Sequence, residues 1–417
     1  MLALEADPRC VRPLLRRRVH LVASGFFHSA ALTSSGVLFT WGAGSGGQLG
    51  RPRAPAAAMA TGGQAPLVGG AAAVPVLEAG GQRVVCAAAG RNHTLALSHA
   101  GRLFAWGRAT AGQLGHGVAT SGGTRRIVDA DAAEPKAIVP FGGAPALPAL
   151  RAVSAGEHFS AALSAAGEVF TWGSAENGRL GRSSEAQAQP VAVPRRAFGG
   201  RRVAAVALGW RHALACTHEG ALYSWGSNRS GQLGQGVRPD VSQPAAVEAL
   251  GKEVVTCIAA GAEHSLAATA DGVLFSWGEG VSGQLGLGHC RSVLHPVGVQ
   301  AMLDREPIAQ LSAGHSHSAM LTSSGKLYTC GDDSYAQLGQ AEPTEAEMEA
   351  LRSLLSATPG GEGVGGDERA AAAPLRLTGK AIAQHQTVPR LADLPRDVRV
   401  AQVACGAWHT VVLITHF

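Results

Sequence analysis

The sequence has few aromatic and charged residues, and it lacks the patterns of several large protein classes. Only 5% of its 417 residues are aromatic and 16% are charged. Its seven cysteines are odd in number and form no CxxC pair, which argues against a zinc site and against a disulfide framework. We therefore expect the cysteines to be reduced, and those within apolar runs to serve as small core residues.

Long apolar runs are also missing. No stretch reaches the roughly 18 apolar residues that a transmembrane helix requires, and residues 1–18 lack the apolar core of a secretory signal. These absences predict a protein without a membrane span, located in the cytoplasm, the nucleus or both. The basic cluster at residues 16–18 leaves organelle targeting open.

Catalytic signatures are absent as well. The sequence contains no G-x-S-x-G, no G-x-x-x-x-G-K-[ST], no HExxH and no distinctive acidic pair. It therefore predicts no enzyme, no catalytic residues and no cofactor. The net charge of +5 is mild for this length, so a nucleic-acid or chromatin surface is permitted without being indicated.

Glycine, in contrast, is abundant, and it marks an internal repeat. Seven related segments begin at Gly25, Gly90, Gly156, Gly209, Gly261, Gly314 and Gly406. The spacings between them are 65, 66, 53, 52, 53 and 92 residues, which gives a unit of about 52 residues with three insertions. A fixed period of this size is typical of a propeller, solenoid or array, in which each unit packs against its neighbours.

Each unit contains two strand-like runs and two turns. In the first unit, HSAALTS is followed by Gly36 and VLFTWG, as expected of a β-hairpin whose glycine adopts positive φ. GQLG follows at 47–50, and we expect its leucine to fill a gap between units. Outer strands must come from the variable segments, for example AAVEAL at 245–250. Four short strands in each of seven units predict an all-β, seven-bladed β-propeller.

Three linked motifs, GxxHS/T, GxLxxWG and GQLG, recur in this order over residues 19–340, and the first returns within 398–417. Together they resemble the repeats of the regulator of chromosome condensation family. The resemblance implies a seven-bladed propeller that acts by binding proteins. The founding member of the family exchanges nucleotide on the small GTPase Ran, and a related subfamily is the plant ultraviolet-B photoreceptor.

The repeats do not complete the last blade. There are seven GxxH-type segments but only six Trp-Gly-type segments, and propellers of the family usually close with an N-terminal GxLYxWG strand. We expect residues 1–18 to be a linker-like segment and 19–417 a single propeller whose last blade lacks its outer hairpin. Either residues upstream of this sequence or a partner would complete it.

Three insertions interrupt the repeat. Residues 51–83 and 116–150 are rich in Ala, Gly and Pro, as expected of exposed loops without a core of their own. Within the third insertion, 341–397, residues 343–355 carry a capping box and an apolar stripe at helical spacing, which predicts a helix.

Six units have a histidine at the same position, namely His28, His93, His212, His264, His317 and His409. Equivalent positions indicate one structural task, such as a buried imidazole bonding a neighbouring backbone group, and we predict no metal site. The third unit has Phe159 instead of histidine, and the sixth has Cys330 instead of the usual tryptophan. We expect each change to loosen its blade modestly.

Functional variation is expected in the two residues between the glycine and the histidine, because their flanks are fixed by the fold. Aromatic residues and arginine are enriched at binding hot spots. The candidate partner-binding residues are Phe26, Phe27, Arg91, Asn92, Glu157, His158, Trp210, Arg211, Glu263, His315 and Trp408. The alternative is that these are ordinary solvated loop residues.

Three functions remain open on this basis. The first is a non-enzymatic protein-interaction propeller, in particular a guanine-nucleotide exchange factor or regulator for a small GTPase. The second is an ultraviolet-B sensor, for which GWRHA at 209–213 is the one close match to the photoreceptor's GWRHT repeats. The third is a recruitment scaffold in chromatin or ubiquitin pathways.

Overall fold

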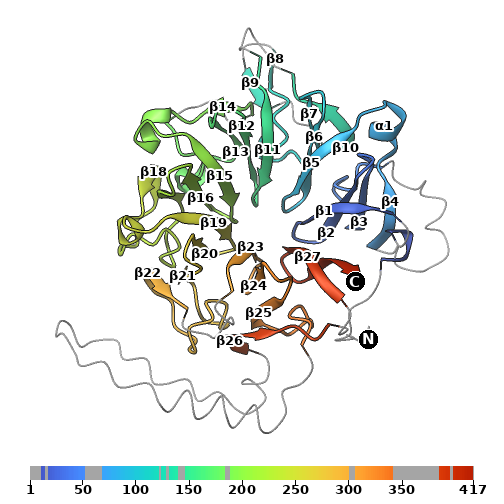
Figure 1. Ribbon diagram of the computed structural model, residues 1–417. Coiled ribbons are helices and arrows are strands. Elements are labelled where there is room, and N and C mark those ends of the chain that lie inside the picture. Colours follow the sequence, from blue (N-terminus) through green and yellow to red (C-terminus); the bar gives the residue numbers. More distant parts are fainter. Residues whose placement is uncertain are drawn as a thin grey trace, which may run out of the picture.

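The computed structural model describes residues 11–14, 17–51, 68–121, 124–127, 131–139, 146–183, 188–299, 306–340, 385–394 and 398–416. They form a ring of antiparallel sheets around a central axis (Figure 1). Six sheets have four strands, and the last blade consists of two strands within the described residues. The fold class is therefore a β-propeller with an incomplete last blade, as predicted.

Each blade runs outward from the axis in chain order. Blade 1 contains β1 (Val19–Ser24), β2 (His28–Thr33), β3 (Leu38–Ala43) and β4 (Val68–Ala73). Blade 2 contains β5 (Val84–Ala89), β6 (His93–Ser98), β7 (Leu103–Gly107) and β10 (Ala132–Ala137). Blade 3 contains β11 (Leu150–Ala155), β12 (Phe159–Ser164), β13 (Val169–Gly173) and β14 (Val191–Ala192).

The remaining blades repeat this arrangement. Blade 4 contains β15 (Val203–Leu208), β16 (His212–Thr217), β17 (Leu222–Gly226) and β18 (Val241–Ala246). Blade 5 contains β19 (Val255–Ala260), β20 (His264–Thr269), β21 (Leu274–Gly278) and β22 (Val293–Gly298). Blade 6 contains β23 (Ile308–Ala313), β24 (His317–Thr322), β25 (Leu327–Asp332) and β26 (His385–Leu391). Blade 7 contains β27 (Val398–Cys405) and β28 (Thr410–His416).

The predicted hairpin joins the second and third strands of each complete blade. In blade 1, Ser29 pairs with Trp41 and Leu32 with Leu38, and the turn glycine Gly36 has a φ of 85°. A residue with a Cβ is strained in this conformation, so the glycine fixes the turn. The leucines of the GQLG-type turns are buried, as predicted: Leu49, Leu114, Leu180, Leu233, Leu285 and Leu338.

The first two insertions were expected to be exposed loops without a core of their own, but both contain regular secondary structure. The first supplies β4 and α1 (Pro75–Ala79), and its Val74 and Leu77 are buried in the core between blades 1 and 2. The second supplies a hairpin of β8 (Val118–Ser121) and β9 (Thr124–Ile127), followed by β10. Every blade needs a fourth strand, and only the variable segments can provide it.

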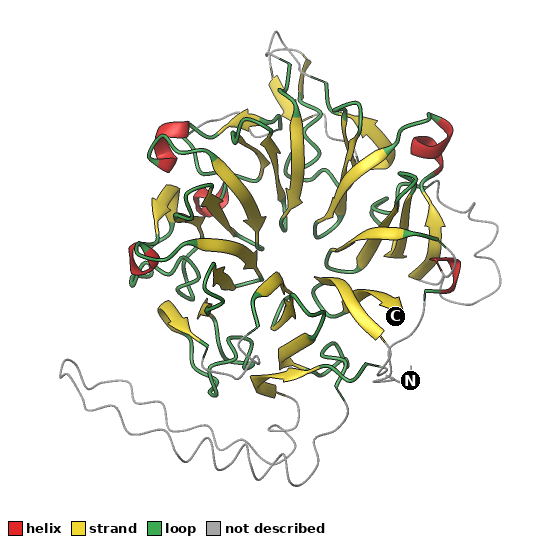
Figure 2. Cartoon of the chain, in the orientation of Figure 1, coloured by secondary structure: helices red, strands yellow, loops and turns green. Residues whose placement is uncertain are grey.

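The outer strand of blade 4 also begins earlier than expected. The strand is β18, and residues 248–250 of the predicted strand form the 3-10 helix η5 (Glu248–Leu250). Pro244 lies within β18, and outermost strands tolerate proline because its missing N–H faces away from the sheet. Two more 3-10 helices are η3 (Glu176–Gly178) and η4 (Arg195–Phe198), and Figure 2 shows η4, η5 and α1 at the periphery of the ring.

Two expectations fall partly or wholly outside the described residues. The helix predicted at 343–355 lies there entirely, although the end of the same insertion supplies β26. Of the linker-like segment 1–18, the structure describes residues 11–14 and 17–18, which include the 3-10 helix η1 (Arg12–Leu14). Among the described residues, no helix has the length and hydrophobicity needed to cross a bilayer.

The hydrophobic core is divided among the seams between neighbouring blades. Six apolar clusters fill the seams from blades 1–2 to blades 6–7. The largest fully buried side chains include four tryptophans, each one residue before the end of a third strand, namely Trp106, Trp172, Trp225 and Trp277. No such cluster lies between blades 7 and 1 among the described residues, and Trp41 at that seam is only half-buried.

Candidate partner-binding rim

Seven tight loops between the first and second strands surround the axis at one face of the ring, and we call them the rim loops. In each, the backbone N–H of the glycine donates to the carbonyl of the residue at the histidine position, as from Gly25 to His28 at 2.8 Å. A Cβ at Gly25 would lie 2.2 Å from the carbonyl oxygen of Gly90, so only glycine fits there.

A closed circuit of backbone hydrogen bonds joins the rim loops. The N–H of Phe26 donates to the carbonyl of Gly90 in blade 2, and equivalent bonds link each following blade to the next. The circuit closes where Ala407 of blade 7 donates to Gly25 of blade 1, at 3.2 Å. The loop backbones are therefore held rigidly, and the side chains that project from them are positioned by the ring.

The repeated histidines tie each blade to the next through side-chain hydroxyls. Their Nε2 atoms lie 2.7–3.1 Å from the hydroxyl oxygens of Thr94, Ser160, Ser265, Ser318, Thr410 and Ser29. The prediction of one shared structural task is consistent with this geometry, but the expected partner was wrong, because the imidazole bonds a hydroxyl and not a backbone group.

The hydroxyl in turn determines which nitrogen of the imidazole carries the proton. Five of these hydroxyls donate to the carbonyl of the glutamine position in a GQLG-type turn, as Ser265 does to Gln232 at 2.7 Å. The hydroxyl must therefore accept a hydrogen bond from Nε2–H, so Nε2 carries the proton of the neutral imidazole. Burial lowers the pKa of His212 to about 3, and that of His28, His93, His264 and His317 likewise.

Blade 3 departs from this scheme in two places that compensate for each other. Phe159 replaces the histidine, and the residue of blade 4 that would carry the hydroxyl is Ala213. Both side chains are fully buried. The polar pair has thus been replaced by an apolar pair across the same seam, which leaves neither partner unsatisfied.

The tryptophans of the third strands make a second link between blades. Nε1 of Trp106, Trp172 and Trp277 donates to the carbonyl of the turn glutamine in the preceding blade, at 2.9–3.0 Å. Trp225 donates to Arg179 in the same way. Cys330 makes only a weak contact of 3.6 Å from Sγ to Gln284, as its replacement of tryptophan suggests.

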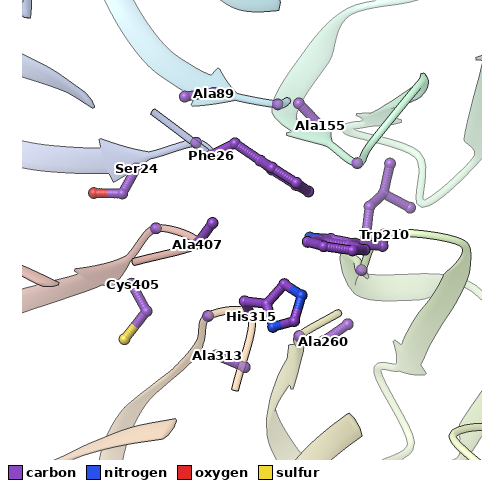
Figure 3. Close-up of a pocket in the computed structure, with 18 residues that line it drawn as sticks. Ser24, Phe26, Ala89, Ala155, Trp210, Ala260, Ala313, His315, Cys405 and Ala407 are labelled. Carbon is purple, nitrogen blue, oxygen red and sulfur yellow. The ribbon is translucent and has the colours of Figure 1, made fainter. Parts of the chain in front are cut away.

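A line of aromatic rings crosses the mouth of the central channel. Phe26 of blade 1 stacks on Trp210 of blade 4, with ring centroids 4.4 Å apart. Trp210 meets His315 edge-on at 4.3 Å, and His315 stacks on Trp408 at 4.5 Å. Figure 3 shows Phe26, Trp210 and His315 converging from different blades.

Both ends of this line are open to solvent. Phe27, which contacts Phe26, is 49% exposed, and Tyr335, which contacts Trp408, is 53% exposed. Below the rings lies a small cavity of about 60 Å³ lined by the glycines and alanines that end the inner strands. Phe26, Trp210 and His315 also line this cavity, whose size suits a few waters.

A basic cluster lies beside the aromatic line, on blades 2 to 4. The carboxylate of Glu157 accepts hydrogen bonds from Arg91 at 2.5 Å and from Arg211 at 3.0 Å, and Nη1 of buried Arg179 lies 4.0 Å from it. Glu157 is only 3% exposed. Three arginines thus surround one glutamate, and half-exposed Arg91 and Arg211 bring positive charge to the surface.

The pKa values of this cluster follow from burial and charge. Burial opposes ionisation of Glu157, but the hydrogen bond and charge of Arg211, with His158 and Arg91, lower its pKa overall. Burial lowers the pKa of His158, and the negative charge of Glu157 only partly offsets this effect. The cluster therefore carries a net positive charge near neutral pH.

The opposite side of the rim is acidic, which the sequence did not reveal. Glu279 and Asp332 each follow a third strand's glycine, and their N–H groups donate to rim-loop carbonyls at 2.8 Å. Burial raises the pKa of Glu279, and the charge of Glu263 adds to this effect. Burial likewise raises the pKa of Asp333, with a further contribution from Asp332. The sequence position directly after each Trp-Gly, or after Cys-Gly in blade 6, could have identified these acidic residues. In each complete blade the N–H of the residue at this position donates to a rim-loop carbonyl.

All the predicted candidates therefore occupy the rim loops, although not all are accessible. Phe27 is well exposed, while Asn92, His158, Trp210, Glu263, His315 and Trp408 are half-buried. Phe26 and Glu157 are buried, at 8% and 3% exposure. Within the described residues, no group of three or more His, Cys, Asp or Glu side chains is arranged to hold a metal ion.

A ring of repeat blades tied by histidines and tryptophans defines a propeller of the chromosome-condensation-regulator type. The RCC1-like domain matches residues 62–416, and the Regulator of chromosome condensation (RCC1) repeat matches residues 19–48. The chain belongs to this family, as the sequence motifs predicted.

Several known proteins are similar to the chain. The Ultraviolet-B receptor UVR8 of Arabidopsis thaliana is 32% identical over 78% of this chain and 67% of the receptor. The human E3 ubiquitin-protein ligase HERC2 is 33% identical over 78% of this chain but only 6% of the ligase. The structure of Prp20p from Saccharomyces cerevisiae superposes with a TM-score of 0.74 at 22% identity, covering 99% of this chain and 86% of Prp20p.

Proposed function

We propose that this chain is a non-enzymatic propeller whose rim binds a protein partner. The observation that supports this most directly is the line of rings from Phe27 to Tyr335, which ends in exposed aromatic side chains on a rigid backbone ring. Aromatic residues on preorganised loops supply binding energy at a low entropic cost.

The charges on either side of this line would orient the partner. Arg91 and Arg211 lie on one side, and Glu263, Glu279 and Asp333 lie on the other. Complementary charges raise the rate of encounter and select one docking orientation. A partner with an acidic patch and a basic patch separated by an apolar strip would match this arrangement.

A small GTPase is our first candidate partner, with the chain as exchange factor or regulator. Prp20p, whose fold is shared, has been described together with its binding to Gsp1p and histones. Exchange by a propeller requires complementary contacts and no catalytic residues, which fits a rim of this kind. A cytoplasmic or nuclear location is part of the same proposal.

Nucleotide release from a panel of small GTPases tests this candidate. Each GTPase is loaded with a fluorescent guanine nucleotide, and its release is followed with and without the purified chain. Acceleration of release from one GTPase would support exchange. Silence across the panel would contradict exchange and would favour a recruitment scaffold in chromatin or ubiquitin pathways, the class to which the relationship with HERC2 points.

Ultraviolet-B sensing is the second candidate, and the rim tryptophans are the observation that favours it. Trp210 and Trp408 both belong to the aromatic line, but each contacts His315 and they do not stack on each other. A sensor of the UVR8 kind would require these rings to act as an absorbing cluster. Ultraviolet-B irradiation that changes the elution volume on a sizing column would support this candidate, and an unchanged volume would contradict it.

A further inference from the structure

The face of the ring opposite the rim carries arginines at a repeated position. The turns between second and third strands lie at this face, because the rim loops occupy the other end of the same blades. In blades 1 to 6, one residue at the start of the first strand accepts a backbone hydrogen bond from this turn, as Arg18 does from Ser34 at 2.7 Å. In the order of the blades, these residues are Arg18, Arg83, Ala149, Arg202, Val254 and Pro307.

Blade 7 also has an arginine at this position, namely Arg399. The residue after it, Val400, donates to the turn glycine of blade 6 in the same way as Val84, which follows Arg83, donates to that of blade 1. Blade 3 lacks the arginine but has Arg151 two residues further on. The arginines of blades 7 and 1 to 4, which are neighbours around the axis (Figure 1), form what we call the basic arc: Arg18, Arg83, Arg151, Arg202 and Arg399.

The repeat makes the basic arc flat. The first strands of blades 1, 2, 4 and 7 pair with their second strands in the same register, with the same irregularity two residues into the paired stretch. Because equivalent residues of repeated units are related by rotation about the axis, they lie at about the same height along it. The basic arc therefore presents its charges in one plane.

Neutral groups hold these arginines, so their charge is not compensated. The guanidinium of Arg202 donates to the turn carbonyls of Ala165 and Ala166 at 3.2 Å, and that of Arg151 to the carbonyl of Val203 at 3.3 Å. No carboxylate among the described residues forms an ion pair with Arg83, Arg151 or Arg202. All three side chains are exposed, and each guanidinium has five N–H donors, of which these contacts use only some.

Acidic residues are scarce around the basic arc. In the described first-strand starts and hairpin turns of blades 7 and 1 to 4, the exposed acidic residues are Glu168 and Glu219. Blades 5 and 6 are more balanced, since Lys326 pairs with Glu306 at 3.1 Å. The exposed arginines in the same segments of blades 7 and 1 to 4 are Arg17, Arg18, Arg83, Arg102, Arg151, Arg201, Arg202 and Arg399.

This surface fits a flat polyanion better than it fits a nucleic acid. A duplex is a rod, which would touch only part of an arc, whereas a plane reaches all of its arginines at once. The exposed aromatic side chains Phe27 and Tyr335 lie at the rim, so among the described residues the basic face offers no exposed ring on which single-stranded bases could stack. Exposed Val254 and Val273 of blade 5 adjoin the arc instead, and apolar side chains of this kind suit the headgroup region of a bilayer.

We propose that the face opposite the rim binds the anionic surface of a lipid bilayer through the basic arc. The charge of the arginines supplies the attraction, and the plane of the arc sets the orientation, with the ring axis along the membrane normal. The rim then faces away from the membrane and stays accessible. The proposal is independent of what the rim binds.

Co-sedimentation of the full chain with vesicles tests the proposal. One set of vesicles contains phosphatidylcholine alone, and the other contains phosphatidylcholine and phosphatidylserine in a ratio of about two to one. We expect binding to the anionic vesicles only, and added salt should weaken it because counterions screen exposed charges. Each arginine near an anionic surface contributes about fivefold to the affinity. Arg83→Gln/Arg151→Gln/Arg202→Gln should therefore weaken binding about a hundredfold.

Two further variants separate the position of the charges from net charge and from folding. Arg229→Gln/Arg238→Gln/Arg291→Gln removes the same charge from exposed arginines in loops that precede fourth strands, and it should bind like the unaltered chain. Arg83→Lys/Arg151→Lys/Arg202→Lys keeps the charge of the basic arc but loses the guanidinium contacts with the carbonyls. It should retain most of the vesicle binding even if its thermal midpoint falls.

Four results would overturn the proposal. They are equal binding to neutral and anionic vesicles, undiminished binding by the glutamine variant of the basic arc, and equal losses in the two glutamine variants. The fourth is tighter binding to duplex DNA than to anionic vesicles at the same concentration of phosphate groups, with the same dependence on the basic arc. A nucleic acid would then be the ligand of this face.

Discussion

At the scale of single residues, six of the seven seams contain a hydrogen-bonded pair of one imidazole and one hydroxyl, which we call the relay. The hydroxyl is committed to a turn carbonyl, so it can only accept from Nε2 of the histidine. Burial then keeps the imidazole neutral. Blade 3 shows that the relay can be replaced if both partners change together, as Phe159 and Ala213 have.

The apolar pair of Phe159 and Ala213 predicts that the effects of substitutions at these two positions on stability are coupled. Phe159→His should lower the free energy of unfolding by about 1–3 kcal/mol, because its Nε2 would face the methyl group of Ala213 without an acceptor. The chain should still fold. Adding Ala213→Ser should recover a large part of this loss, which a double-mutant cycle by urea denaturation would measure. Independent, additive effects of the two changes would contradict the relay.

The neutral histidines predict sensitivity to acid. The pKa of the buried histidines in the folded chain is about 3, or about 4 for His409, against an ordinary value of 6.5. The unfolded chain therefore binds more protons between these values. Their stabilising effect is fully present above pH 6.5 and is lost as the pH falls toward 3. Below pH 6, each histidine should reduce the free energy of unfolding by about 1.4 kcal/mol per pH unit.

Introducing the apolar pair of blade 3 at another seam tests whether a buried histidine causes this pH dependence. His212→Phe combined with Ser265→Ala removes one relay and should make the pH dependence of the free energy of unfolding shallower by about one proton. Urea denaturation at several pH values between 7 and 5 would measure this. An unchanged slope would show that His212 does not titrate as the structure indicates.

At the scale of the strand and its turn, each seam depends on the carbonyl at the start of the turn. Gln232 receives two donors, the hydroxyl of Ser265 and Nε1 of Trp277. Arg179 receives Nε1 of Trp225, and the relay hydroxyl that would be its second donor is replaced by Ala213. The tryptophan donor at the same motif position should therefore contribute differently to stability in different blades.

Substitution of the two tryptophans tests this difference. Trp225→Phe should destabilise the chain by about 1–3 kcal/mol more than Trp277→Phe, because only the former leaves a buried carbonyl without its donor. Both tryptophans are fully buried, so the loss of apolar contact is similar in the two variants. Equal shifts in the urea midpoint would argue that the carbonyl of Arg179 finds another partner.

The elements that the sequence predicted correctly are those in which the backbone conformation or close packing between blades restricts the residue type. The turn at Gly36 and the leucines of the GQLG turns belong to this group. The fourth strands were expected in the variable segments, but their bounds could not be predicted because they are edge strands, where Pro244 and runs of alanine and glycine are tolerated. The acidic side of the rim was missed because Glu279 reaches the rim only through the pairing of its blade.

At the scale of the whole molecule, the ring closes without a complete seventh blade. Gln402 accepts from the N–H of Val22, His409 meets Ser29, and Ala407 donates to Gly25. These polar contacts join the last blade to the first where no apolar cluster is found among the described residues. The rim loops are therefore complete, although blade 7 has only two strands among the described residues.

A complete rim is what the proposed function requires. The seven loops meet in one backbone circuit, and the aromatic line uses residues from blades 1, 4, 6 and 7. A partner bound at this face would contact several blades at once, so its binding should depend on rim side chains and not on the opposite face of the ring. The exposed residue Val254 at that opposite face offers a control, since it is 52% exposed against 49% for Phe27.

Nucleotide release from the GTPase panel, compared between rim and control variants, tests the account most directly. We expect the chain to accelerate release from at least one GTPase and the double variant Phe27→Ser/Trp408→Ser to lose about tenfold or more of this acceleration, as loss of hot-spot aromatics does. Val254→Ser should retain it. Absence of acceleration across the panel, or equal losses in the rim and control variants, would contradict the account.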